Sequence, residues 1–255
     1  MTETQDADAR LVGADRVLAV LAELARHADG VGLDEMARVM ASPKPTVHRA
    51  LASLRRAGFA AQDGHGRYVL GDEFLRLAFA HHEARPDHVR VVPVLRALSE
   101  RYGETAHYAT LDGRWVVYRS KLDPPTGAVR LSSVVGGRNP AHTTAVGKLL
   151  LSGILRSVQQ VRDWIGETAL TTPTPTSIGS AEELYAELAR TRERGFGVDN
   201  QENEAGVNCL AVPVFLNSPS EPSGAVSVSA LAYRTPLDRL IEDVPTIKAI
   251  VEDPT

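Results

Sequence analysis

A compact group of hydroxyl, histidine and basic side chains lies in the first third of the chain, where it could bind an anionic surface. Its members are Ser42, Lys44, Thr46, His48, Arg49, His65 and Arg67. Residues 44–67 contain five lysines and arginines against a single acid, although the whole chain has a net charge of −4. Clustered positive charge attracts phosphates, and hydroxyl groups can donate to phosphate oxygens. The segment therefore predicts local binding to DNA, whereas the overall charge excludes a polycation that coats it.

A second group, residues 143–147, combines small side chains with the start of a predicted helix. The first backbone amides of a helix have no partners within it, and together with the helix dipole they favour an anion such as a carboxylate. The same small residues also suit close packing of the helix against a neighbouring element. The sequence leaves both interpretations open.

Catalytic and metal chemistry have weaker support. The single cysteine, Cys209, could act as a nucleophile only with a base such as His107 or His142 within hydrogen-bonding reach. Cys209 lies in an apolar segment that favours an inert thiol. His142 lies two residues after Pro140, a setting typical of a structural histidine. No histidine or acid spacing matches a zinc site. We therefore expect no enzyme, no catalytic residue, no metal and no cofactor.

Three helices and a β-hairpin must present the first group. Apolar residues recur at helical spacing in three segments between residues 11 and 57, and Pro45 suits the first turn of the third helix. Short strands at residues 59–62 and 67–70 flank an Asp-Gly-His-Gly turn. This order is typical of a winged helix-turn-helix, whose third helix enters the major groove. A helical bundle with a solvated basic face is the alternative.

The remaining chain predicts a larger domain of mixed helices and strands. Strands are expected at residues 128–134, 209–215 and 224–230, and a helix at residues 143–155. Their interleaving is typical of an α+β fold. A helix followed by Pro86 marks the boundary. We therefore expect a DNA-binding domain at residues 10–72, a linker helix at 73–86, and an effector-binding and oligomerisation domain at 87–255.

Bulk composition agrees with this division. A length of 255 residues favours two domains, and 43% hydrophobic with 24% charged residues is typical of a globular protein. No apolar run is long enough to span a bilayer, and the polar, acidic start is unlike a secretory signal. We expect a cytoplasmic protein with no membrane partner.

Residues 44–51, Lys-Pro-Thr-Val-His-Arg-Ala-Leu, resemble the recognition helix of IclR-type transcription regulators. Pro45 replaces the usual serine of that motif, and Ala50 replaces a leucine. Further matches follow in order: a wing strand at 66–71, an effector-domain signature at 140–148, and later strands at 195–215 and 227–229. Together the matches span about residues 12–240. The tail beyond residue 237 departs from the family pattern, which leaves its packing open.

The resemblance implies an N-terminal winged helix-turn-helix, a linker helix, and a C-terminal GAF-like α/β effector-binding domain with a mainly antiparallel sheet. It implies a homodimer joined through the N-terminal helices, or a dimer of dimers, on a palindromic double-stranded DNA operator. We expect a repressor whose operator binding responds to a small effector resembling an organic acid. The effector-pocket residues that the resemblance implies are Thr144, Ala145, Val146, Asp199, Cys209, Ser227 and Ser229.

Each of these positions also has a purely structural interpretation. Cys209 can fill an apolar core, and Ser227 and Ser229 share one strand face that solvent could cover. Asp199 would repel an anion unless it binds a hydroxyl group or acts through water. A ligand-sensing scaffold without DNA recognition is the alternative for the whole chain, because Pro45 would kink the third helix if it lay beyond the first turn.

Overall fold

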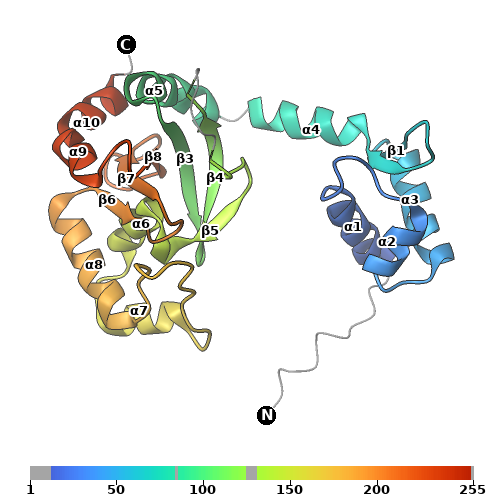
Figure 1. Ribbon diagram of the computed structural model, residues 1–255, viewed down its shortest axis with the longest axis horizontal. Coiled ribbons are helices and arrows are strands. Elements are labelled where there is room, and N and C mark those ends of the chain that lie inside the picture. The colour runs from blue at the N-terminus through green and yellow to red at the C-terminus, as the bar shows by residue number, and fades with distance from the viewer. Residues whose placement is uncertain (1–12, 84–85, 125–130, 254–255) are drawn as a thin grey trace. The chain divides into compact units, whose positions relative to one another are not determined.

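Two compact units, Met1–Arg85 and Pro86–Thr255, make up the computed structural model, which describes residues 13–83, 86–124 and 131–253 (Figure 1). Each unit has a buried apolar core of its own. In chain order the elements are α1 (Gly13–Leu24), α2 (Leu33–Val39), α3 (Lys44–Arg56), β1 (Ala60–Gln62), β2 (Tyr68–Leu70), α4 (Asp72–Glu83), α5 (Pro86–Tyr102), β3 (Thr105–Asp112), β4 (Trp115–Leu122), β5 (Arg138–Pro140), the 3-10 helix η1 (Ala141–Thr143), α6 (Ala145–Ile154), α7 (Val158–Ile165), α8 (Ala181–Arg194), β6 (Gly197–Asn200), β7 (Val207–Val214), β8 (Gly224–Leu231), α9 (Leu237–Glu242) and α10 (Val244–Glu252).

The N-terminal unit packs α1, α2 and α3 around one core beside the hairpin of β1 and β2. Leu24, Met36 and Leu51 bring one buried side chain from each helix, and Tyr68 closes the core from the hairpin. The two strands pair antiparallel, with Ala60 opposite Leu70. The predicted winged helix-turn-helix is therefore confirmed as the fold of this unit.

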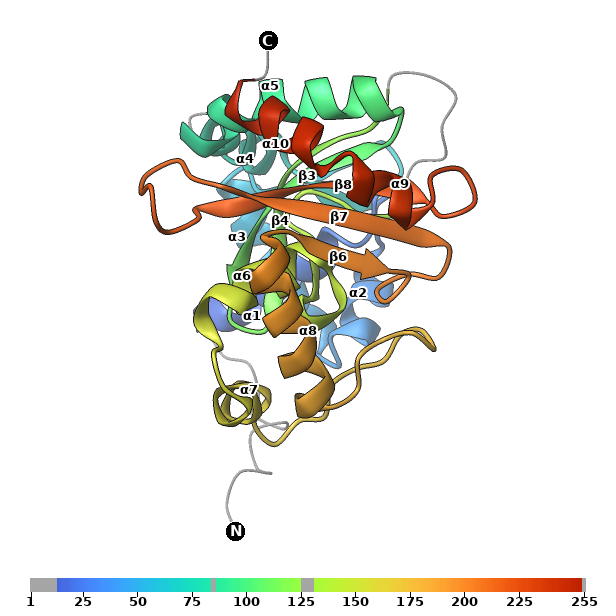
Figure 2. The same cartoon turned by 90° about the vertical axis from the view of Figure 1, so that its left-hand side faces the viewer.

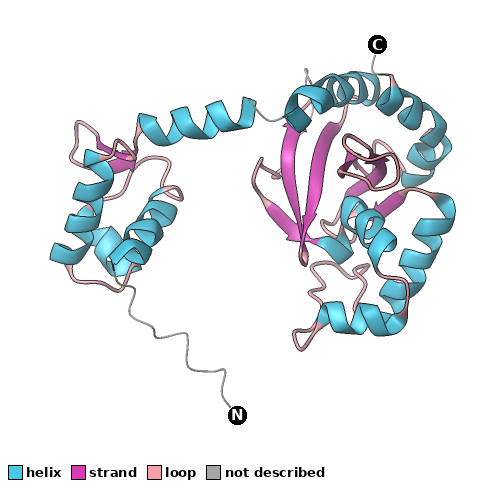
Figure 3. Ribbon diagram, turned by 180° about the vertical axis from the view of Figure 1, so that it is seen from behind, coloured by secondary structure: helices cyan, strands magenta, loops and turns pink. Residues whose placement is uncertain are grey.

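The C-terminal unit is built on one antiparallel sheet of six strands in the order β5-β4-β3-β8-β7-β6. Helices cover both faces of this sheet (Figure 3). A layer of α5, α9 and α10 packs on one face, and a layer of α6, α7 and α8 packs on the other (Figure 2). The predicted α+β fold with a mainly antiparallel sheet is confirmed.

The side chains of β8 point alternately to the two faces of the sheet, and each face is covered by a different layer of helices. Val226 and Val228 belong to the core under α5, whereas Ala225 belongs to the core under α6. Because successive side chains of a strand point to opposite faces, Ser227 and Ser229 lie on the same face as Ala225. Both serines are buried, so the solvated face considered from the sequence is wrong.

Two glycines allow the start of α6 to approach its neighbours closely. A Cβ atom at Gly147 would lie 2.0 Å from the carbonyl oxygen of Ala141, and one at Gly197 would lie 2.1 Å from that of Ala145. Both distances are far below any normal contact, so only glycine fits at these positions. The close packing inferred from the small residues is therefore real, and it fixes the position of the helix start.

The chain departs from the predicted elements in two places. Residues 128–130 of the predicted strand lie outside the described residues, and residues 131–134 form no strand. The Lys121 ammonium donates to the carbonyls of Leu131 and Ser133 at 2.9 and 2.8 Å. These two carbonyls therefore accept from a side chain and not from the backbone amides of a neighbouring strand. The predicted helix at 143–155 starts as η1 and continues as α6, because Thr144 caps α6 with an extended backbone.

The tail beyond residue 237 forms two packed helices, α9 and α10. Leu240, Val244 and Ile247 are buried in the core shared with α5 and the sheet. Pro245 lies in the first turn of α10, where its missing amide hydrogen breaks no helical bond.

Candidate functional site

The N-terminal half of α3 separates a buried side from a basic exposed side. Val47, Ala50 and Leu51 are buried in the core of the unit, whereas His48 and Arg49 are exposed. Among the described residues, neither exposed side chain forms a hydrogen bond or ion pair. We call the side of this helix that carries the exposed Lys44, His48 and Arg49 and the half-buried Thr46 the α3 edge. Its first turn carries no acid, so the α3 edge can bind an anionic surface.

The other residues at the start of α3 support the same geometry. The Lys44 ammonium lies 2.8 Å from the carboxylate of Asp34, and both side chains are more than half exposed. Surface ion pairs of this kind contribute little, so a phosphate could replace the carboxylate. The Ser42 hydroxyl donates to the carbonyl of Met40 at 3.0 Å, and Thr46 is half-buried. Pro45 lies in the first turn of α3, where it does not kink the helix.

Hydrogen bonds tie the hairpin to α3 and shape its tip. The Arg55 guanidinium donates to the Gln62 side-chain oxygen at 3.1 Å, and the Gln62 amide donates to the Gly66 carbonyl at 2.7 Å. Asp63 Oδ1 accepts from the backbone amides of Arg67 and His65 at 2.8 and 2.9 Å. The Arg67 amide bond in particular lowers the pKa of Asp63.

The two predicted DNA contacts of the hairpin differ in their surroundings. His65 is exposed at the tip. The Arg67 guanidinium instead donates to the carbonyl of Gly30 in the same unit. Arg67, like Lys44, would therefore have to leave a contact within its own unit in order to bind DNA.

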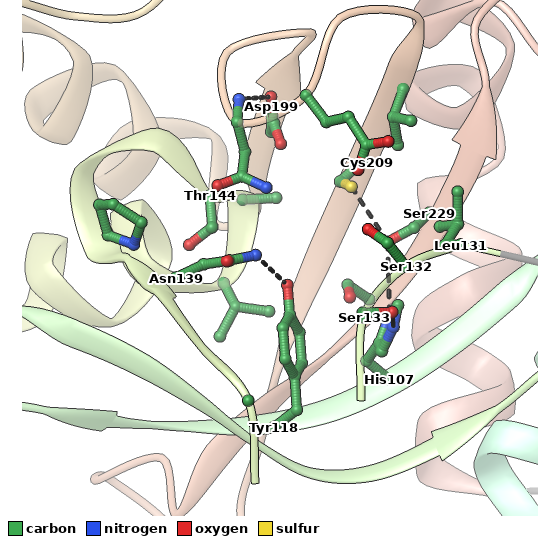
Figure 4. A pocket seen from close by; sticks show the side chains of 18 of the residues that line it. His107, Tyr118, Leu131, Ser132, Ser133, Asn139, Thr144, Asp199, Cys209 and Ser229 are labelled. Atoms are coloured by element: carbon green, nitrogen blue, oxygen red, sulfur yellow. Dashed lines mark hydrogen bonds between the residues drawn. The ribbon is translucent and has the colours of Figure 1, made fainter. Parts of the chain in front are cut away.

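One cavity of about 480 Å³ lies in the C-terminal unit between the α6 face of the sheet and the start of α6 (Figure 4). We call it the α6 cavity. All seven predicted effector-pocket residues line it, namely Thr144, Ala145, Val146, Asp199, Cys209, Ser227 and Ser229. Its volume falls in the usual range for small-molecule sites.

The start of α6 offers backbone donors to the cavity. The Gly147 amide bonds the Thr144 hydroxyl at 3.0 Å. The amides of Ala145 and Val146 precede it in the helix, and neither has an acceptor among the described residues. These two amides and the helix dipole make one end of the cavity suitable for a carboxylate.

Asp199 contributes a buried carboxyl group to the cavity wall. Its Oδ1 accepts from the backbone amides of Glu202 and Asn203 at 2.7 and 3.4 Å. Burial disfavours the ionised form and raises the pKa of Asp199 to about 7, although the Glu202 amide bond and the Lys148 charge oppose that shift. Asp199 can therefore carry either charge state near neutral pH.

A chain of hydrogen bonds crosses the floor of the cavity from β7 to the segment after residue 130 (Figure 4). The Cys209 thiol donates to the Ser229 hydroxyl at 3.0 Å, and Ser229 lies 3.3 Å from His107 Nδ1. His107 Nε2 lies 2.8 Å from the Ser133 hydroxyl. Burial lowers the pKa of His107 to about 3 and raises the pKa of the Cys209 thiol. A neutral histidine and an un-ionised thiol do not make an activated nucleophile.

Sequence reasoning missed several residues that line the cavity. His107 was considered only as a base, and Ser133, Tyr118 and Asn139 were not considered. The Asn139 amide donates to the Tyr118 hydroxyl at 3.0 Å, and the rings of Tyr118 and His107 lie 4.7 Å apart. Asn203, Glu204 and Val207 also line the cavity, and the resemblance over residues 195–215 was the signal that could have found them.

Buried charges support the β6–β7 turn behind the cavity. The fully buried Lys148 of α6 forms an ion pair with Glu202 in that turn, and its ammonium lies 3.9 Å from Glu187 of α8. On the other side of the turn, the hydroxyls of Thr174 and Ser177 donate to the carbonyls of Gln201 and Glu202 at 2.7 and 2.6 Å. Side chains from three segments therefore hold the turn that carries Asn203 and Glu204 into the cavity.

His142 has the structural role that its sequence setting suggested. It is buried, and its Nε2 donates to the carbonyl of Thr171 at 2.8 Å. Burial lowers its pKa. Among the described residues, no group of three or more histidine, cysteine, aspartate or glutamate side chains could hold a metal ion. Within those residues, no helix combines the length and apolar character needed to cross a membrane.

Comparisons with known proteins cover both units. The family model "IclR helix-turn-helix domain" matches residues 13–64, and "Bacterial transcriptional regulator IclR C-terminal" matches residues 88–254. The transcriptional regulator XynR of Escherichia coli is 33% identical over 230 residues, which cover 86% of each chain. The transcriptional repressor IclR of the same species is 30% identical over 242 residues, covering 94% of this chain and 87% of its own.

A solved structure has the same fold along almost the whole chain. It is an IclR homologue from Microbacterium hydrocarbonoxydans complexed with 4-hydroxybenzoate. Its TM-score is 0.74 at 20% identity, and the match covers 93% of this chain and 98% of the other.

Proposed function

The chain belongs to the IclR family of bacterial transcriptional regulators, and we propose that its C-terminal α6 cavity controls how its N-terminal unit binds a palindromic operator. The protein is a DNA-binding transcription regulator. In this proposal it works as a repressor in the cytoplasm, and a small organic acid in the cavity changes its affinity for the operator.

The α3 edge is the single observation that carries the DNA-binding role. His48 and Arg49 point away from a packed core, and the residues around them have an excess of positive charge. A helix with this division can enter the major groove without repacking. Lys44 and Ser42 then lie at the helix start, where phosphate contacts fix its register.

Arg49 gives the sharpest test of this role. We expect Arg49→Ala to weaken operator binding by about tenfold or more, because a guanidinium that contacts a base or phosphate contributes on the order of 1–3 kcal/mol. Binding would be measured by fluorescence anisotropy on DNA fragments selected from genomic DNA by the purified protein, at several salt concentrations. The wild-type affinity should fall steeply with salt.

Arg156→Ala is the matched control, because Arg156 is an exposed arginine in the other unit. It should leave operator affinity unchanged. Purified wild-type protein that prefers no genomic fragment over random DNA at moderate salt would overturn the proposed function.

The effector assignment rests on the start of α6. The amides of Ala145 and Val146 supply two donors for a carboxylate without any cationic side chain. The homologue of the same fold that binds 4-hydroxybenzoate holds a carboxylate ligand, which agrees with an organic acid here.

A dimer is proposed because the N-terminal unit exposes large apolar side chains. Leu18 of α1 is 62% exposed, and Leu75 and Phe79 of α4 are 44% and 61% exposed. Apolar groups of this size gain free energy when a second copy covers them. Two recognition helices in one dimer would then match the two halves of a palindrome.

The two alternative functions lose their main support. The scaffold alternative rested on Pro45 and Ala50. Pro45 lies in the first turn of α3 and Ala50 is buried in the core, and both positions support the DNA-reading geometry. Membership in a regulator family points away from an enzyme, and the raised pKa of Cys209 argues against a catalytic thiol.

A further inference from the structure

Two polar groups in the α6 cavity have unused hydrogen-bonding capacity. The Ser227 hydroxyl is 4% exposed, lines the cavity and has no hydrogen-bond partner among the described residues. Asp199 is 2% exposed and uses Oδ1 for two backbone amides, which leaves Oδ2 as an acceptor. The Cys209 thiol donates to Ser229 and also lies beside the Asp199 carboxyl, without occupying the Ser227 hydroxyl. Both side chains line the cavity, so a ligand with hydrogen-bonding groups of its own can bond to them where an apolar ligand cannot.

The charges of the lining limit how much negative charge a ligand can carry. Arg138 is the only cationic side chain among the described lining residues, and its guanidinium pairs with Asp112 at 2.9 Å with 57% exposure. Asp199 and Glu204 add two carboxyl groups. The amides of Ala145 and Val146 can compensate one carboxylate, but nothing in the described lining compensates a second.

The apolar part of the cavity lining does not offer two parallel aromatic rings between which a flat ligand ring could stack. Its apolar lining consists of small or branched aliphatic residues and prolines, such as Val146, Val207 and Pro140. The two rings in the lining, His107 and Tyr118, are tilted by 38° to each other. A bare aromatic ring would leave the Ser227 hydroxyl and the Asp199 oxygen without partners.

We propose that the α6 cavity selects a monocarboxylate whose carbon chain carries several hydroxyl groups. The carboxylate binds the amides of Ala145 and Val146, and the hydroxyl groups bind Ser227 and Asp199. This inference rests on the proposed function for the identity of the site, and it adds the class of the ligand.

The test is calorimetric titration of the full-length protein with matched acids. D-glycerate, L-threonate and D-gluconate are the hydroxylated monocarboxylates. Propanoate, butanoate and hexanoate are the same chains without hydroxyl groups, glucarate carries a second carboxylate, and benzoate and 4-hydroxybenzoate are flat rings. We expect at least one hydroxylated monocarboxylate to bind at least tenfold more tightly than its unsubstituted match, than glucarate and than either ring.

Variants then locate the hydroxyl contacts. Ser227→Ala should weaken the best hydroxylated acid about tenfold and leave its unsubstituted match unchanged, because one hydrogen bond is lost. Ser220→Ala is the control, since Ser220 lies in the exposed loop between β7 and β8. Circular dichroism checks that each variant folds.

Each other outcome overturns the proposal. It fails if no hydroxylated monocarboxylate binds, if an unsubstituted acid, a ring or glucarate binds as tightly, or if Ser227→Ala has no effect. Operator binding without ligand is measured on the same protein. A retained operator preference with a failed ligand series would reject this inference alone, whereas lost operator preference would reject the proposed function.

Discussion

Asp199 combines burial, a place in the cavity wall and a pKa raised to about 7. Several charged or titratable groups surround it. Lys148 and Glu202 lie behind it, Glu204 follows on the same turn, and Cys209 is its partner in the register of β6 and β7. The Glu202 backbone amide and the Lys148 charge favour the ionised carboxyl of Asp199, whereas burial and the negative charge of the Glu202 side chain favour the protonated one.

The affinity for a hydroxylated acid should therefore depend on pH. A ligand hydroxyl donates best to the ionised Asp199, so below pH about 7 binding must first release the proton of this carboxyl. We expect affinity to rise by up to about tenfold per pH unit as pH increases toward 7, and to level off above it. Titrations in buffers of different ionisation enthalpy would detect the released proton.

The control for this prediction is Asp199→Asn, which keeps an acceptor but cannot ionise. It should remove the pH dependence. His107, with a pKa of about 3, does not titrate in the same range. Equal affinity for the wild-type protein at pH 6 and pH 8 would contradict the role given to Asp199.

Among the secondary-structure elements, α6 offers a comparison between two of its own glycines. A Cβ at Gly147 would meet the backbone of Ala141 at 2.0 Å, whereas a Cβ at Gly153 has nothing within 4 Å. The first glycine therefore positions the helix, and the second one only lowers its helical propensity.

Substituting each glycine by alanine should give opposite results. We expect Gly147→Ala to lower the free energy of unfolding by about 3 kcal/mol, and to weaken acid binding because the amides of Ala145 and Val146 shift. Gly153→Ala should raise the free energy of unfolding by about 0.5–1 kcal/mol. Urea unfolding measures both, and a neutral Gly147→Ala would show that the approach of η1 to α6 is not needed.

The elements that the sequence predicted well are those with a local pattern. The three N-terminal helices, the hairpin, and strands β7 and β8 follow apolar spacing and turn residues that short segments carry. The start of α8 also has a local signal, because the Ser180 hydroxyl caps the helix by accepting from the Glu183 amide at 3.2 Å. Residues 131–134 were wrongly predicted as part of a strand, because the contacts of Leu131 and Ser133 come from the side chain of the distant Lys121.

The α6 cavity was only partly predictable, because some of its residues are marked by local sequence patterns and others come together only through tertiary contacts. The helix start and the β8 serines stand out in the sequence because a motif or an alternation marks them. Tyr118 and Asn139 come together through the pairing of β4 with β5, and no local pattern encodes that pairing. Their roles depend on tertiary contacts that a single sequence does not display.

For the whole molecule, the apolar groups exposed on α1 and α4 predict how copies assemble. Leu18→Glu places a charge on the proposed dimer surface without touching the core, since Leu18 is mostly exposed. We expect this substitution to shift the protein toward monomer in sedimentation equilibrium. We also expect it to weaken operator binding, because a monomer binds only one half-site of a palindrome.

Val39→Glu is the matched control, because Val39 is a similarly exposed apolar residue of α2 in the same unit. It should leave the oligomeric state unchanged. If Leu18→Glu sediments like the wild-type protein, the α1 surface is not the interface, and dimers must form elsewhere.

The separation of the α3 edge from the packed side of its helix also matters for engineering. Val47, Ala50 and Leu51 hold the helix in place, while the side chains facing outward contribute little to that packing. Positions 44, 46, 48 and 49 could therefore be randomised together as a library without loss of folding. New operator preferences could be selected from such a library while the sensing half of the protein stays as it is, which would turn this regulator into a retargetable genetic switch.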